Sequence, residues 1–147
     1  MSDPFSEFYE GPHWARAISV VLVDDSPLAM AALVRWLHKH LPLHIVGEAE
    51  DGLKGLDLIS RLQPDLVITD LQMPGLDGLE LVERLRLNYP QMRLIVASSD
   101  ETPAILDASL RRGANAFIPK NRLPEELAAT LLRLFPQAVE AATTCNA

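Results

Sequence analysis

Residues 64–78 read P-D-L-V-I-T-D-L-Q-M-P-G-L-D-G, and this stretch decides the fold class. The apolar run at 66–69 starts after a proline and an aspartate and ends at Asp70, which is typical of a short strand buried on both faces. A polar loop follows, and from Gly78 to about Asn88 apolar residues recur at helical spacing. A buried strand, a loop and an amphipathic helix make one unit of a parallel βα repeat.

The same alternation extends over most of the chain. Strands are predicted at 18–23, 43–49, 66–69, 93–97 and 115–119, followed by helices at 27–40, 53–62, 78–88, 102–113 and 124–135. Ser26 and Pro27 provide an N-cap and a first helical residue for the first helix, and Thr102 and Pro103 are expected to cap the fourth. Five such repeats predict an α/β fold of the doubly wound type, a (βα)5 three-layer sandwich with helices on both faces of a parallel sheet.

Pro119 indicates which strand lies at the edge of this sheet. A proline cannot donate a hydrogen bond to a neighbouring strand, so the last predicted strand is expected at an edge. The flavodoxin-like strand order 2-1-3-4-5 places the fifth strand there, and we predict that order. We expect one folded domain at residues 17–137, an N-terminal extension at 1–16 and a C-terminal tail at 138–147.

The composition narrows the class of protein. The chain has 147 residues, of which 48% are hydrophobic and 22% charged, as in a globular domain. Its formal net charge of −7 argues against direct binding of nucleic acid, which usually requires a basic face. The only cysteine is Cys145, and neither a secretory signal nor a membrane-length apolar run is present. A cytoplasmic protein that does not bind membranes is therefore expected.

Four of the eight aromatic residues occur in the first fourteen positions, namely Phe5, Phe8, Tyr9 and Trp14. Such a segment either covers the core of its own domain or contacts a partner or a second copy of the chain. Both interpretations remain open at the level of sequence.

Polar residues follow four of the five predicted strands. Asp24 and Asp25 follow the first strand, Asp70 the third, Ser98 the fourth and Lys120 the fifth. Ligands of open parallel sheets bind at the carboxyl ends of the strands, near the switch point between strands one and three. We therefore expect these side chains to converge on one pocket.

The chemistry of such a pocket follows from its charges. Three neighbouring carboxylates repel one another and raise at least one pKa, unless a hard divalent cation such as Mg²⁺ or Mn²⁺ binds between them. Asp70 could then attack a phosphoryl group whose oxygens are contacted by Ser98 and Lys120. The chain contains no G-x-x-x-x-G-K-[ST] segment, so a nucleotide donor is not expected.

Four segments together resemble the receiver domain of two-component response regulators: V-D-D-S-P (23–27), the 64–78 stretch, L-I-V-A-S-S (94–99) and G-A-N-A-F-I-P-K (113–120). The resemblance covers roughly residues 18–136 and implies a receiver domain. It implies a phosphoacceptor at Asp70 and a phosphate-contacting base at Lys120. It also implies metal binding by Asp24, Asp25, Asp70 and the backbone carbonyl of Gln72, with Ser98 and Phe117 as the hydroxyl and aromatic of the conformational switch.

The chain departs from the family pattern in two places. Asn121 follows Lys120 where the family usually has proline, and Pro119 precedes it. Ser99 occupies a position that is more often Ala or Gly, which narrows the access of a phosphodonor. The loop after Lys120 and the mouth of the pocket are therefore the parts of the site that the resemblance describes least well.

The resemblance implies a signalling switch and not a metabolic enzyme. Its phosphate would come from a sensor histidine kinase or a phosphotransfer protein, and its output would be a homodimer or a partner on the last strand–helix face. Transcription could also be controlled through a DNA-binding domain absent from this chain, since the eleven residues after Pro136 are too few to form one.

Two other interpretations are weaker. A phosphohydrolase of the haloacid-dehalogenase type expects D-x-D-x-[TV] after the first strand, whereas the candidate nucleophile here follows the third. A receiver that docks without being phosphorylated is disfavoured because every key position is filled.

Overall fold

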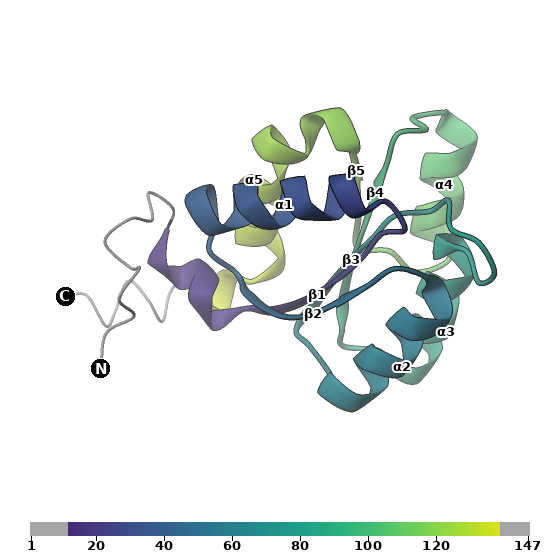
Figure 1. The fold of residues 1–147 in the computed structure, drawn as a ribbon, viewed down its shortest axis with the longest axis horizontal. Coiled ribbons are helices and arrows are strands. Elements are labelled where there is room, and N and C mark those ends of the chain that lie inside the picture. The colour runs from purple at the N-terminus through teal and green to yellow at the C-terminus, as the bar shows by residue number, and fades with distance from the viewer. Residues whose placement is uncertain (1–11, 139–147) are drawn as a thin grey trace.

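Five parallel strands form one sheet in the order β2-β1-β3-β4-β5, in a computed structural model that describes residues 12–138 (Figure 1). The predicted order is therefore confirmed, with β5 at an edge. The strands are β1 (Ser19–Val23), β2 (His44–Ala49), β3 (Leu66–Thr69), β4 (Arg93–Ser98) and β5 (Ala116–Pro119).

Five α-helices connect and cover the strands. They are α1 (Pro27–His40), α2 (Gly52–Leu62), α3 (Gly78–Asn88), α4 (Pro103–Arg111) and α5 (Leu123–Leu134). Their bounds differ by at most two residues from those predicted. Two short 3₁₀ helices were not predicted, η2 (His13–Ala17) before β1 and η3 (Lys120–Arg122) after β5. No helix within residues 12–138 combines the length and apolarity that a membrane crossing requires.

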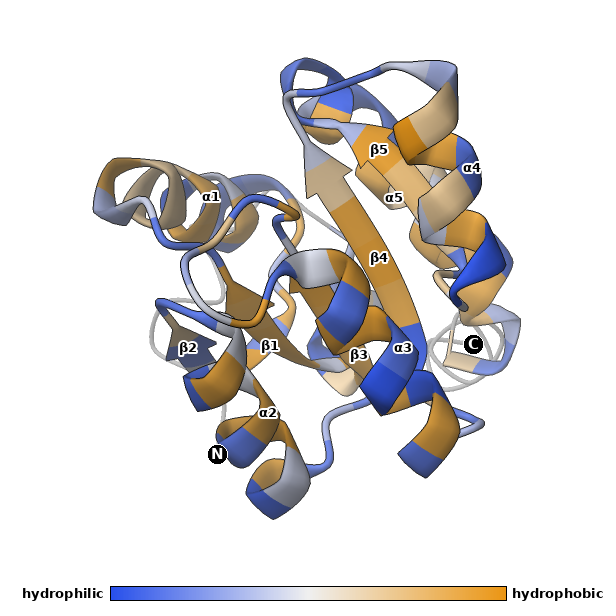
Figure 2. Ribbon diagram, turned by 90° about the vertical axis from the view of Figure 1, so that its right-hand side faces the viewer, coloured by the Kyte–Doolittle hydropathy of each residue, from blue (hydrophilic) through white to orange (hydrophobic). Residues whose placement is uncertain are grey.

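Side chains of each strand alternate between two helical layers. Figure 2 shows β1, β3 and β4, which lie between these layers, coloured hydrophobic along most of their length. In β1, Val20 and Leu22 pack in the cluster that includes residues of α1 and α5, whereas Val21 and Val23 pack in the cluster that includes residues of α2 and α3. Figure 1 shows the corresponding arrangement, with α1 and α5 over one face of the sheet and α2 and α3 over the other. The two apolar layers hold the carboxyl ends of β1 and β3 side by side.

The helix starts follow the sequence in one case and depart from it in another. The Ser26 hydroxyl accepts a hydrogen bond from the Ala29 amide at 3.2 Å, so α1 begins as predicted. Thr102 occupies the N-cap position of α4 and Pro103 begins the helix, as predicted, but the Thr102 side chain makes no cap hydrogen bond. The turn is held by Asp100 instead, whose carboxylate accepts from the Thr102 amide at 3.0 Å.

The described part of the N-terminal segment packs against the domain. Ala15 is fully buried, and the half-buried Trp14 contacts the core cluster beneath α1 and α5. Trp14 thus covers the core of its own domain. Phe5, Phe8 and Tyr9 lie outside the described residues, so their predicted role stays a prediction.

Candidate functional site

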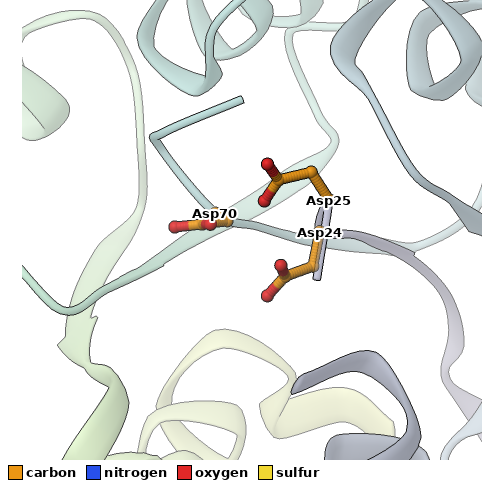
Figure 3. A group of neighbouring side chains, drawn as sticks. All are labelled: Asp24, Asp25 and Asp70. Atoms are coloured by element: carbon orange, nitrogen blue, oxygen red, sulfur yellow. The ribbon is translucent and has the colours of Figure 1, made fainter. Parts of the chain in front are cut away.

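Three carboxylates lie together at the carboxyl ends of the two central strands (Figure 3). Asp24 and Asp25 follow β1 directly, and Asp70 follows β3. Each of them offers one oxygen that lies within 4.8 Å of the other two. The parallel pairing of Val23 with Thr69 sets this arrangement, because it brings the two strand ends to the same level of the sheet.

Asp24 is held at both carboxylate oxygens. Its Oδ1 accepts from the Ser26 amide at 2.9 Å, in the turn that starts α1. Its Oδ2 accepts from the Lys120 ammonium, also at 2.9 Å. Asp25 points away from this pair of contacts and is exposed. The two neighbouring acids therefore differ in how freely their oxygens can bind a ligand.

Lys120 reaches the acids from the end of β5, the strand at the edge of the sheet. It follows β5 as the first residue of η3, and its Nζ lies 3.4 Å from Asp70 Oδ2. Burial alone would lower its pKa, but the hydrogen bond to Asp24 and the charges of Asp70 and Asp24 outweigh that effect, so the pKa of Lys120 is raised above its usual range. Lys120 is therefore a protonated group in contact with two carboxylates.

Asp70 is a partly buried acid with a raised pKa. Burial raises its pKa above the usual range and the charge of Asp24 adds to the increase, against the opposing effects of Lys120 and the Leu71 amide. Its Oδ1 accepts from the Leu71 amide at 2.8 Å, whereas its Oδ2 is the oxygen that faces Lys120. The two oxygens of this carboxylate are thus in different environments.

Two residues that contact the backbone carbonyl of Asp70, Thr69 and Gly78, were not predicted from the sequence. The fully buried Thr69 hydroxyl donates to the Asp70 carbonyl oxygen at 2.9 Å. Gly78 packs so closely on the same carbonyl that a Cβ at this position would lie 2.1 Å from the oxygen. A polar residue at the end of the apolar run L-V-I-T was the only signal for Thr69, and the glycine of the 64–78 stretch the only signal for Gly78.

Ser98 and Gln72 lie on the other side of the pocket. Ser98 is buried and its hydroxyl accepts from the Asp100 amide at 3.1 Å. Ser98, Asp100 and the exposed Gln72 line a cavity of about 320 Å³ next to Leu71. Phe117 is half-buried and packs against the core cluster of the α2 and α3 layer.

The donor set of the site fits a hard divalent cation. Two oxygens bound to one Mg²⁺ at ~2.1 Å lie at most ~4.2 Å apart. The carboxylate oxygens here lie within 4.8 Å of one another, which is close enough for an ion to bind among them directly or through water. All three donors are oxygens, which Mg²⁺ and Mn²⁺ prefer. The pocket thus brings together three carboxylates that could hold a cation and a lysine, at the strand ends where the sequence predicted these residues to meet.

Comparison with known proteins gives the family. The model of the response regulator receiver domain matches residues 20–132. The nitrate/nitrite response regulator protein NarL of Escherichia coli (strain K12) is 33% identical over 109 residues, which are 74% of this chain and 50% of that protein. The receiver domain structure of the response regulator NarL from Mycobacterium tuberculosis has a TM-score of 0.69 and 31% identity, covering 86% of this chain and 96% of that chain. The chain therefore belongs to the response regulator receiver domain family.

The chain spans about half the length of the NarL proteins that it matches. A relative with a different activity is the protein-glutamate methylesterase/protein-glutamine glutaminase 4 of Myxococcus xanthus, which is 37% identical over 74% of this chain but only 31% of that protein. The likeness is thus to the receiver part of larger proteins whose remaining parts differ. Receiver domains are in general signalling switches.

Proposed function

We propose that Asp70 accepts a phosphoryl group from a phosphohistidine on a sensor kinase or a phosphotransfer protein. The observation that carries the proposal is the position of Asp70, at the end of the central strand with two acids and Lys120 around it. In the transfer, an Asp70 oxygen forms a bond to phosphorus while the bond from phosphorus to the donor breaks, and the donor leaves with that electron pair. The reaction makes the chain a switch and not an enzyme acting on other molecules.

The roles of the surrounding residues follow from their contacts. Asp25, Asp24, Asp70 and the backbone carbonyl of Gln72 are the proposed ligands of Mg²⁺ or Mn²⁺, which when bound offsets the negative charge of the incoming phosphoryl group. Asp25 and Asp70 are the proposed direct carboxylate ligands, and of the two neighbouring acids Asp25 is the exposed one. Asp24 already accepts two hydrogen bonds and acts through water.

Lys120 is the proposed contact to the phosphoryl oxygens. Its ammonium lies 3.4 Å from Asp70 Oδ2. It stays protonated because the two acids raise the pKa of Lys120 by more than burial lowers it. Transfer adds a phosphoryl group beside Asp70, and Lys120 supplies a positive charge close to it.

Ser98 and Phe117 are the proposed switch residues. In this structure the Ser98 hydroxyl accepts from the Asp100 amide, so a move toward a phosphoryl oxygen would loosen that turn before α4. Phe117 is half-buried and could then turn inward. The output would be read on the face of β5 and α5, by a partner, by a second copy or by a DNA-binding domain outside this chain. A cytoplasmic location is part of the same proposal.

Intact mass measurement tests the proposal. Incubation with acetyl phosphate and Mg²⁺ should add one phosphoryl group to the chain, and Asp70→Asn should abolish the gain. Asp77→Asn is the matched control, because Asp77 lies in the same loop and caps α3 through the Glu80 amide at 2.9 Å, a role that Asn can also perform. A phosphoryl group still gained by Asp70→Asn would contradict the assignment.

A further inference from the structure

The peptide group between Asp70 and Leu71 is held at both of its polar ends. Its carbonyl oxygen accepts from the Thr69 hydroxyl at 2.9 Å. Its N–H donates to Asp70 Oδ1 at 2.8 Å. Because a peptide group is planar, fixing the direction of the carbonyl also fixes the direction of the N–H. Thr69 therefore influences the carboxylate of Asp70 through one rigid unit.

Gly78 restrains the same peptide group from a third direction. A Cβ on Gly78 would lie 2.1 Å from the Asp70 carbonyl oxygen and 2.7 Å from the Leu71 Cα. The Gly78 amide also donates to the Leu71 carbonyl at 2.9 Å. The start of α3 is thus packed directly on the backbone of the acceptor, and only a glycine leaves room for it.

We propose that Thr69 is a positioning residue that selects which oxygen of Asp70 attacks the phosphoryl group. The peptide held by Thr69 and Gly78 directs its N–H at Oδ1, and this leaves Oδ2 toward Lys120 at 3.4 Å. Oδ2 is therefore the attacking oxygen, and the Thr69 hydroxyl keeps it in line. The inference rests on the proposed phosphoacceptor role of Asp70 and adds to it a residue that touches neither metal nor phosphoryl group.

The burial of Thr69 explains why its hydroxyl acts on this carbonyl. Thr69 is 0% exposed, so its donor has no access to water and is satisfied by the Asp70 carbonyl. Without the hydroxyl, the carbonyl loses a buried donor and the peptide can tilt. A tilt moves the Leu71 N–H away from Asp70 Oδ1. The carboxylate group of Asp70 can then rotate, so that neither oxygen keeps its position. Misplacement of a reacting atom by about 1 Å can cost on the order of 100-fold in rate.

The test compares Thr69→Val, which removes the hydroxyl at nearly constant volume, with Thr69→Ser, which restores it. Ser109→Ala is the matched control, because Ser109 is also 0% exposed and its hydroxyl donates to the Ile105 carbonyl at 2.8 Å within α4, not to the backbone of Asp70. The rate of phosphorylation by acetyl phosphate is measured by intact mass at saturating Mg²⁺. Thermal unfolding of each variant gives the folded fraction.

Thr69→Val is expected to be phosphorylated about tenfold more slowly than the natural chain, as for a modest misplacement of the attacking oxygen. Thr69→Ser should stay within about twofold, and Ser109→Ala should lose stability without losing rate. Equal rates for Thr69→Val and the natural chain would overturn the inference and leave Asp70 as the acceptor. Failure of the natural chain itself to gain a phosphoryl group would instead contradict the proposed function.

Discussion

Among the charged residues of this domain, Arg86 is the one whose removal is expected to lower the free energy of unfolding most. Its guanidinium donates to a set of oxygens around the end of α3 and the approach to β5: the carbonyls of Tyr89, Pro90, Met92 and Gly113 and the side-chain oxygen of Asn115, at 2.7–3.4 Å. Asn115 in turn accepts from the Leu94 amide at 2.8 Å. One side chain thus ties α3 to the chain before β4 and before β5.

The magnitude follows from these bonds and from the cost of burying the charge. A hydrogen bond from a charged donor contributes about 1.5–3 kcal/mol net to the free energy of unfolding. Its loss leaves the acceptor unsatisfied at those positions that water cannot reach. Burial, followed by the charge of Arg93, lowers the pKa of Arg86, so removing the guanidinium also removes a desolvation penalty. Arg86 is only half-buried, and water can replace part of the set. We expect Arg86→Met to lower the free energy of unfolding by about 3 kcal/mol.

Urea denaturation followed by circular dichroism measures this loss. Arg84→Met is the matched control, because Arg84 lies in the same helix but makes an exposed ion pair with Glu80 at 3.0 Å. Such a pair contributes about 0.5 kcal/mol at most. If Arg86→Met costs no more than Arg84→Met, the bonds of Arg86 contribute nothing beyond those of a surface arginine, and the reasoning is refuted.

Three further predictions concern the acidic pocket. The pKa of Asp70 is raised in the folded chain, so the stability that protonation provides at low pH is lost as the pH rises through that pKa. Without Mg²⁺, Asp70→Asn should therefore gain stability over the natural chain from about pH 4 upward, as urea denaturation at several pH values would reveal. Asp24→Ala should weaken Mg²⁺ binding about tenfold, as expected of a group that orients metal ligands. Asp25→Ala should weaken it more, and equal losses in a titration would refute this order. Changing Gln72 and Asp100 together should alter the dephosphorylation rate several-fold at nearly constant Mg²⁺ affinity, and an unchanged decay of the phosphorylated mass would contradict it.

The sequence predicted the arrangement of the strand ends because that arrangement depends on topology alone. A parallel sheet brings its carboxyl ends to one edge, so residues that follow β1, β3 and β5 meet without any knowledge of side-chain conformation. Asp24, Asp70 and Lys120 are therefore in contact as expected, although Asp24 and Lys120 are 96 residues apart. The edge position of β5 was predictable for a similar reason, since Pro119 lacks the donor that a central strand needs.

The details that escaped the sequence depend on side-chain conformation or on packing between segments. Arg86 looks like a solvated residue of an amphipathic helix, and its bonds to Gly113 and Asn115 join residues 27 and 29 positions apart. In the sequence, Thr69 looks like an ordinary β-branched residue of a strand, and nothing marks its hydroxyl. The Thr102 side chain makes no cap hydrogen bond, and the Asp100 carboxylate accepts from the Thr102 amide in the same turn. No local pattern encodes the contacts of Arg86, because they require α3 and the approach to β5 to be placed first.

The charges of the pocket explain why it suits a divalent cation and then a phosphoryl group. Three ionised carboxylates and one protonated lysine sum to two negative charges, which a single divalent cation balances. Burial raises the pKa of Asp70 and the neighbouring charge of Asp24 raises it further, so a bound cation would favour the ionised form of Asp70. Asp24 and Asp70 each have an oxygen that accepts a hydrogen bond from a backbone amide. Repulsion between the two side chains therefore changes the protonation of Asp70 and not the side-chain conformations. Asp70 thus combines a raised pKa with one oxygen held by a backbone amide and a second oxygen that faces Lys120.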